Sequence, residues 1–176
     1  MAHHAQREFC ERVRDRFLSK FQDPDAVILD CGSLDINGNN RYLFASDDYL
    51  GIDVGAGKNV DRVCPIHLFD APDETYDIII STECFEHDRW YPESMQNITR
   101  MLKRGGLFLF TCATTGRPEH GTTRSEPDSA PFTNDYYKNL TAEDVRAALP
   151  LEDYEQHGFS GNVQAADLYF WGIKKR

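Results

Sequence analysis

Acidic and glycine residues follow two short apolar runs in the first third of the chain. Asp30 and Gly32 come directly after Val27–Leu29, a run typical of a buried parallel strand. Ligands of doubly wound sheets bind just outside the carboxyl ends of the strands. A glycine there lets a ligand approach the backbone closely, and a carboxylate accepts hydrogen bonds from ammonium or hydroxyl groups.

A second acid stands at a spacing that suits a nucleoside. Asp53 ends the strand-like stretch 49–53 and lies about 20 residues after Gly32, the offset at which an acidic side chain meets a ribose. Either stretch alone would fit a plain turn after a strand. Together they favour a loop that holds a nucleoside-containing cofactor.

Three further side chains could transfer protons. His87 is the first choice as a general base, because it closely follows the apolar strand 75–81 and histidine titrates near neutral pH. His120 and Tyr136 come next. A lone histidine is more often structural, so this role is an expectation for the structure to test.

The elements that must position these residues alternate between strand and helix patterns, which predicts a parallel α/β sheet. Apolar residues at three- and four-residue spacing predict an amphipathic helix over 6–21 that packs on the sheet or covers a cleft. Further helices are expected at 39–45, 92–103 and 141–149, and strands at 27–29, 49–53, 60–63, 75–81, 107–112, 151–159 and 165–173.

Five stretches in this order carry a family resemblance: 29–33, 51–54, 76–81, Glu83-Cys84-Phe85-Glu86-His87 and 102–106. With them, the chain resembles the class I S-adenosylmethionine-dependent methyltransferases, in particular the compact small-molecule group with an E-x-x-E-H stretch after the fourth strand. The resemblance implies a Rossmann-like, doubly wound, mostly parallel seven-stranded sheet with an antiparallel C-terminal hairpin. It implies one methyltransferase-like domain over residues 1–176, with an N-terminal helical segment at 1–22.

The resemblance also implies which residues meet S-adenosylmethionine. The first-strand motif would meet the methionine part, Asp53 the ribose and Val54 the adenine, while other residues flank the adenine edge or line the floor near the sulfonium. The implied cofactor-binding set is Asp30, Cys31, Gly32, Ser33, Asp53, Val54, Pro65, Ile66, Ser81 and Glu83. Two positions depart from the family pattern: Leu34 replaces a second loop glycine, and Pro65 replaces an acid expected at the adenine amine.

The expected reaction is methyl transfer to a small polar molecule, at a hydroxyl of a metabolite or a sugar-like acceptor. The departures at Leu34 and Pro65 keep open a regulatory or interaction protein that binds the cofactor without turnover. A nicotinamide-dependent oxidoreductase is disfavoured because Gly32 and Gly38 do not form G-x-G-x-x-G. Residues 113–140 follow the fifth strand and form either a lid over the acceptor or a disordered surface excursion. The aromatic residues Phe132, Tyr136 and Tyr137 favour packing over solvation, and therefore the lid.

Composition limits the partners and the compartment. A net charge of −10 argues against nucleic acid, and no apolar run reaches the ~20 residues of a membrane span. The five cysteines form no C-x-x-C pair, so no metal is expected and a reducing cytoplasm is favoured. The expected partner is a small-molecule acceptor, and homodimerisation is left open.

Overall fold

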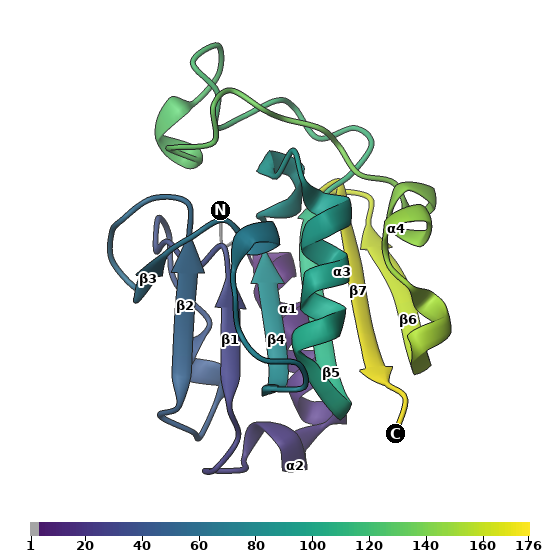
Figure 1. Cartoon of the computed structure of the whole chain (residues 1–176). Coiled ribbons are helices and arrows are strands. Elements are labelled where there is room, and N and C mark those ends of the chain that lie inside the picture. Colours follow the sequence, from purple (N-terminus) through teal and green to yellow (C-terminus); the bar gives the residue numbers. More distant parts are fainter. Residues whose placement is uncertain (1–3) are drawn as a thin grey trace.

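The computed structural model describes residues 4–176, and within them seven strands form one sheet of order β3-β2-β1-β4-β5-β7-β6 (Figure 1). Strands β1 to β5 run parallel, β7 runs antiparallel to β5, and β6 runs antiparallel to β7. This confirms the predicted fold class with its C-terminal hairpin. The strands are β1 (Ile28–Cys31), β2 (Tyr49–Asp53), β3 (Arg62–Val63), β4 (Tyr76–Thr82), β5 (Leu102–Ala113), β6 (Tyr154–Asn162) and β7 (Asp167–Lys174).

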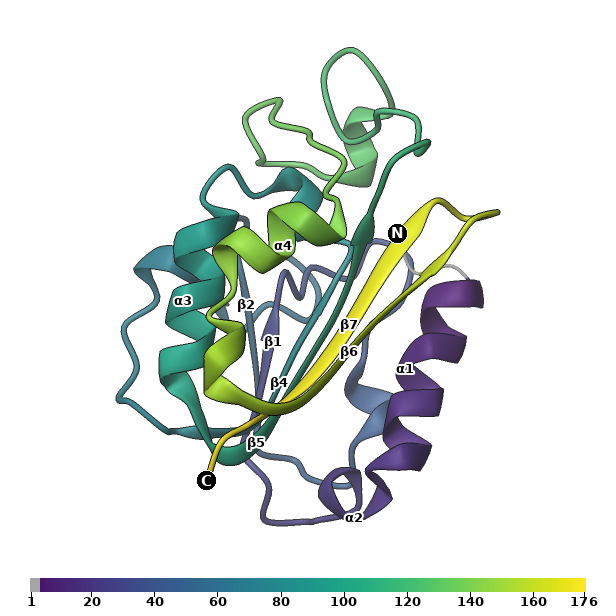
Figure 2. The same ribbon diagram turned by 90° about the vertical axis from the view of Figure 1, so that its right-hand side faces the viewer.

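Helices cover both faces of the sheet, as a doubly wound fold requires (Figure 2). Helices α1 (His4–Arg16) and α2 (Leu18–Phe21) lie on one face, and α3 (Tyr91–Met101) and α4 (Ala142–Ala148) lie on the other. Single 3₁₀ turns at Arg41–Leu43, Ile66–Leu68, Phe85–His87, Pro127–Ser129 and Leu151–Asp153 connect these elements.

Successive side chains of the central strands point to opposite faces of the sheet, so each face has its own hydrophobic core. Ile78 and Ile80 of β4 pack in the cluster beneath α1, whereas Ile79 between them packs in the cluster beneath α3 and α4. All three are fully buried. Because side chains of a strand point alternately to opposite faces, an unbroken apolar run is what a strand covered on both sides needs.

Several predicted elements differ from the structure, and β5 begins at Leu102 rather than at the predicted residue 107. The helix predicted over 6–21 breaks at Phe17 into α1 and α2, and positions 1–3 of the expected N-terminal segment lie outside the described residues. The helix predicted over 39–45 is one 3₁₀ turn. The helix predicted to end at Lys103 ends at Met101, because Leu102 already pairs with Tyr76 in the sheet. The strand predicted from residue 151 begins at Tyr154, after a 3₁₀ turn.

The long segment after β5, residues 114–140, crosses the carboxyl-end edge of the parallel strands (Figure 1). We refer to it as the lid loop. It is held by its own hydrogen bonds: Asp135 accepts from the backbone and the hydroxyl of Thr123, and Glu119 accepts from Thr122 and Arg124. The loop ends at Thr141, which caps α4 through the predicted capping box with Asp144.

No helix among residues 4–176 is both long and apolar enough to cross a membrane.

Candidate functional site

A pocket of about 300 Å³ opens where the carboxyl ends of β1, β2 and β4 meet the lid loop. Its walls come from the loop after β1, from the end of β2, from the 3₁₀ turns at 66–68 and 85–87, and from lid residues 129–134 and Tyr136. The pocket lies at the edge where the sequence places the chemistry-bearing residues.

The loop after β1 has a conformation that only glycine adopts readily at its tightest point. Gly32 has φ of +80°, and a β-carbon there would lie 2.5 Å from the sulfur of Cys84. The amides of Gly32 and Ser33 both donate to the carbonyl of Ile52, at 2.9 and 3.0 Å. The loop is therefore fixed against β2 with its backbone at the pocket.

Asp53 is oriented by two backbone amides at the end of β2. Its carboxylate accepts from Leu34 and from Gly55, each at 3.1 Å, and burial raises its pKa. Leu34, the departure from the family pattern, packs its side chain on Gly57, where a β-carbon would come within 2.3 Å of it. The residue that replaces the glycine thus still holds the acid in place.

Three residues of the pocket lining have side-chain oxygens without a hydrogen-bond partner among the described residues. They are Gln6 of α1, Asp30 and Ser33, and each of these oxygens is buried. The other Asp30 oxygen accepts from Tyr49 and, at 3.4 Å, from Asn40. Burial raises the pKa of Asp30 to about 6, and these two hydrogen bonds hold it from rising further. Oxygens without partners in a pocket lining suit a ligand that donates hydrogen bonds.

The other predicted cofactor residues divide into two groups. Val54, Pro65 and Ile66 line the pocket. Cys31 and Ser81 lie outside its wall, fully buried within the sheet, where the Ser81 hydroxyl donates to the carbonyl of Cys31 at 2.8 Å.

Glu83 also lines the pocket, but its carboxylate is held by a buried charge network. It accepts from Thr111 at 2.9 Å and from Arg117 at 2.8 Å, and Arg117 also donates to Asp167 at 3.0 Å. The network joins the end of β4 to β5, β7 and the start of the lid loop.

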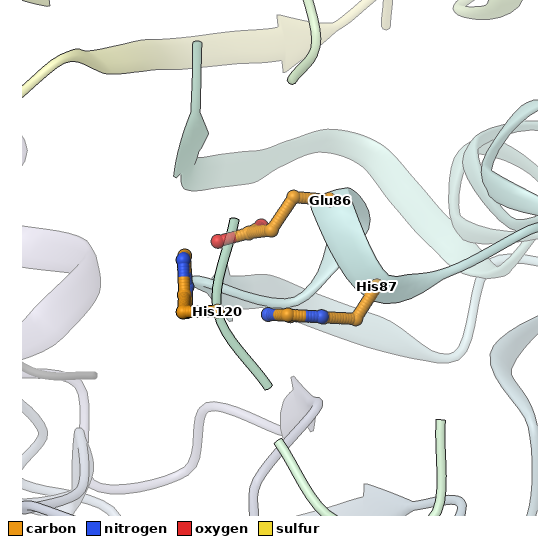
Figure 3. Close-up of side chains that lie close together, drawn as sticks. All are labelled: Glu86, His87 and His120. Carbon is orange, nitrogen blue, oxygen red and sulfur yellow. The ribbon is translucent and has the colours of Figure 1, made fainter. Parts of the chain in front are cut away.

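The three candidate proton-transfer residues lie close to the pocket. His87 and Tyr136 line it, whereas His120 lies outside its wall, with its ring centroid 5.0 Å from that of His87. Burial and then the neighbouring His120 lower the pKa of His87 to about 4. His87 is therefore neutral at pH 7. Beside the two imidazoles lies the fully buried carboxylate of Glu86, which the sequence reading assigned no role (Figure 3).

Sequence reasoning missed several wall residues, among them Gln6, Asn40, Trp90 and Phe132. Gln6 carried a signal, because it is a polar residue one helical turn before Phe9 on the buried face of α1. Phe132 carried none, since its contact with Gly55 depends on the path of the lid loop.

Comparison with known proteins identifies the family and the fold. Residues 1–123 match the family described as a methyltransferase domain. Similar solved structures include the YcgJ protein of Bacillus subtilis, with a TM-score of 0.64 and 13% identity over 94% of this chain and 99% of the other.

Two further similar structures have named activities. One is the 1,6-didemethyltoxoflavin-N1-methyltransferase of Burkholderia thailandensis, bound to 1,6-didemethyltoxoflavin and S-adenosylhomocysteine (TM-score 0.58, 17% identity, 100% of this chain and 93% of the other). The other is phosphoethanolamine N-methyltransferase 2 of Haemonchus contortus (TM-score 0.62, 15% identity, 94% of this chain and 53% of the other). At these identities the likeness shows the fold. No curated protein matches the chain.

Proposed function

The chain belongs to the methyltransferase-domain family and is an S-adenosylmethionine-dependent methyltransferase, and on this premise we propose that its acceptor is a hydroxyl group of a small polar molecule. A metabolite or a sugar-like compound is the expected class. The observation that carries the proposal is that His87 and Tyr136 line the same pocket as Gly32 and Asp53.

The residues of the pocket fit the cofactor. The unpartnered oxygens of Gln6, Asp30 and Ser33 suit the ammonium of its methionine part, and the Asp53 carboxylate suits the ribose hydroxyls. Because Gly32 has no side chain, the cofactor can approach the backbone of this loop closely. Two similar proteins have S-adenosylhomocysteine or S-adenosylmethionine in their solved structures. When bound, this cofactor supplies a methyl group activated on a sulfonium.

The lid loop supports an acceptor site over the cofactor. Its residues 129–134 and Tyr136 line the pocket, and the guanidinium of Arg89 lies 5.7 Å from the centre of the Tyr136 ring. Orienting an acceptor in line with the methyl group can contribute about 7–11 kcal/mol to lowering the barrier in the best cases. Holding the acceptor is therefore the main task that we assign to the lid loop.

His87 supports a hydroxyl acceptor. Because its low pKa keeps it neutral at pH 7, its imidazole can accept a hydrogen bond from a hydroxyl that reaches the pocket wall. A base with so low a pKa removes a hydroxyl proton poorly on its own, so we assign it orientation first. His120 and Tyr136 complete the proposed catalytic set.

The test is transfer of a labelled methyl group from S-adenosylmethionine to a metabolite extract, followed by mass spectrometry and NMR of the products. We expect products methylated on oxygen, and a strong loss of transfer in His87→Ala but not in His157→Ala, a histidine of β6. Products methylated on nitrogen or carbon would overturn the hydroxyl proposal while leaving the methyltransferase assignment intact.

Two further points stay predictions. The five cysteines are free thiols, which supports a reducing compartment such as the cytoplasm. Homodimerisation is to be tested by light scattering.

A further inference from the structure

We propose that Glu86, His87 and His120 bind a divalent transition-metal ion, Zn²⁺ by donor set, beside the cofactor pocket. One carboxylate oxygen and one nitrogen of each imidazole lie within 4.8 Å of one another. The side chains converge from the turn after β4 and from the lid loop (Figure 3). Two histidines and one glutamate are a donor set that catalytic zinc sites use, with a fourth position left open.

The strongest support is the state of Glu86. Its side chain is fully buried, and neither carboxylate oxygen makes a full hydrogen bond with the described residues. The backbone amides of Glu86 and Ala113 lie near the carboxylate and offset only part of the cost of its burial. A buried polar group without partners is costly and requires an explanation, and a bound cation provides one.

Each imidazole contacts the backbone and keeps a nitrogen that could bind an ion. Nδ1 of His120 lies 3.1 Å from the carbonyl oxygen of Pro118. His87 interacts with the backbone of Tyr136, while its Nδ1 is buried with no hydrogen-bond partner among the described residues. Metal-binding histidines typically donate their second nitrogen to a carbonyl or carboxylate in this way.

The ion would connect two parts of the site. His87 lies in the pocket wall, and His120 belongs to the lid loop, so one ion would fasten the lid loop to the end of β4. In one respect the inference rests on the proposed function: the open coordination position would take the acceptor's oxygen. With the ion bound, His87 would act as its ligand, and the ion rather than the imidazole would hold the acceptor oxygen and lower the pKa of the bound hydroxyl.

The test is titration of the chelator-treated full chain with Co²⁺, a spectroscopic probe for zinc sites, in the absence of cofactor and acceptor. We expect one ion per chain with visible absorption bands. Loss of an outer partner of a metal ligand already costs about 10–100-fold in affinity. Glu86→Gln and His120→Ala should each therefore weaken Co²⁺ binding by about 100-fold or more, and His157→Ala should leave it unchanged.

Circular dichroism and S-adenosylmethionine binding will verify that both variants are folded. Absence of Co²⁺ binding, or equal affinity in folded Glu86→Gln and wild type, would overturn the metal site. Methyl transfer to a hydroxyl that chelation does not affect would also overturn it, yet would uphold the proposed acceptor. If the wild type binds Co²⁺ tightly and both variants lose that binding, the metal site is upheld. If methyl transfer is then found only to nitrogen, the hydroxyl acceptor is overturned.

Discussion

The ring of Phe132 lies directly against the backbone of Gly55, so that a β-carbon added to Gly55 would come within 1.9 Å of the ring. Gly55 follows Asp53 by two residues and donates its amide to that carboxylate. The lid loop therefore rests on the segment that orients the proposed ribose-binding acid. The position of the lid loop and the shape of this segment are linked through one contact.

Gly55→Ala should displace Phe132 and loosen the lid loop, because overpacking costs about 1–3 kcal/mol and this ring can move away. Trypsin should then cleave faster after Arg124, which lies exposed in the loop. Phe132→Ala should also speed cleavage. In the Phe132→Ala background the change at Gly55 should add nothing, which a double-mutant cycle will measure. An unchanged cleavage rate in Gly55→Ala would contradict the contact.

Asp53→Ala should weaken binding of S-adenosylmethionine by roughly 1.5–3 kcal/mol, the range for hydrogen bonds to a charged group. The reason is that a carboxylate fixed by two backbone amides is lost from the pocket wall. Calorimetric titration measures the change, with the exposed Asp25→Ala as the matched control. Equal affinity in the Asp53 variant and the wild type would remove Asp53 from the cofactor site.

Stability of the cofactor-free chain should carry a pH dependence from Asp30. Its pKa is raised to about 6 by burial, so between about pH 4 and 6 the folded chain binds more protons than the unfolded chain. The contribution of Asp30 to stability is thus complete below about pH 4 and is lost as the pH rises through about 6.

Asp30→Asn should abolish that dependence. The stability of the variant relative to wild type should rise by about 3 kcal/mol from pH 4 to pH 7, as measured by urea denaturation at each pH. A constant difference across this range would mean that Asp30 does not titrate there.

Arg117→Ala should destabilise the fold by about 3 kcal/mol, because it leaves the buried carboxylates of Glu83 and Asp167 without their cation. This value is the lower end of the range of about 3–5 kcal/mol for breaking a buried ion pair, because the Arg117 side chain is 20% exposed. Guanidinium denaturation measures the loss. Arg124→Ala, which removes only the exposed pair with Glu119, should change stability far less. Similar losses in both variants would show that the buried network adds no special stability.

Local patterns predicted the fold and placed several residues of the candidate site at one edge of the sheet, because both depend on where the strands end. Asp30, Gly32 and Asp53 sit where an apolar run stops, and the carboxyl ends of parallel strands meet at one edge. Ser81 also stands at a strand end but lies outside the pocket wall. Its position at the end of β4 is right, but its hydroxyl turns to a neighbouring carbonyl within the sheet.

Contacts between distant segments could not be predicted in this way. Glu86 and His120 are brought together only by the path of the lid loop, so the sequence suggested no metal. The Phe132 contact with Gly55 has the same origin. The end of α3 failed for a different reason: Leu102 pairs in the sheet before Gly105 and Gly106 are reached, so tertiary pairing overrode the local stop signal.

The position of Gln6 has a practical consequence for handling the protein. This residue reaches the pocket from the first turn of α1, and the N-terminal end of α1 lies at the same edge of the molecule as the lid loop (Figure 1). The C-terminus lies at the opposite edge. An affinity tag or a fluorescent fusion should therefore be attached after Arg176, because a bulky partner joined ahead of α1 would lie at the edge of the molecule that holds the pocket.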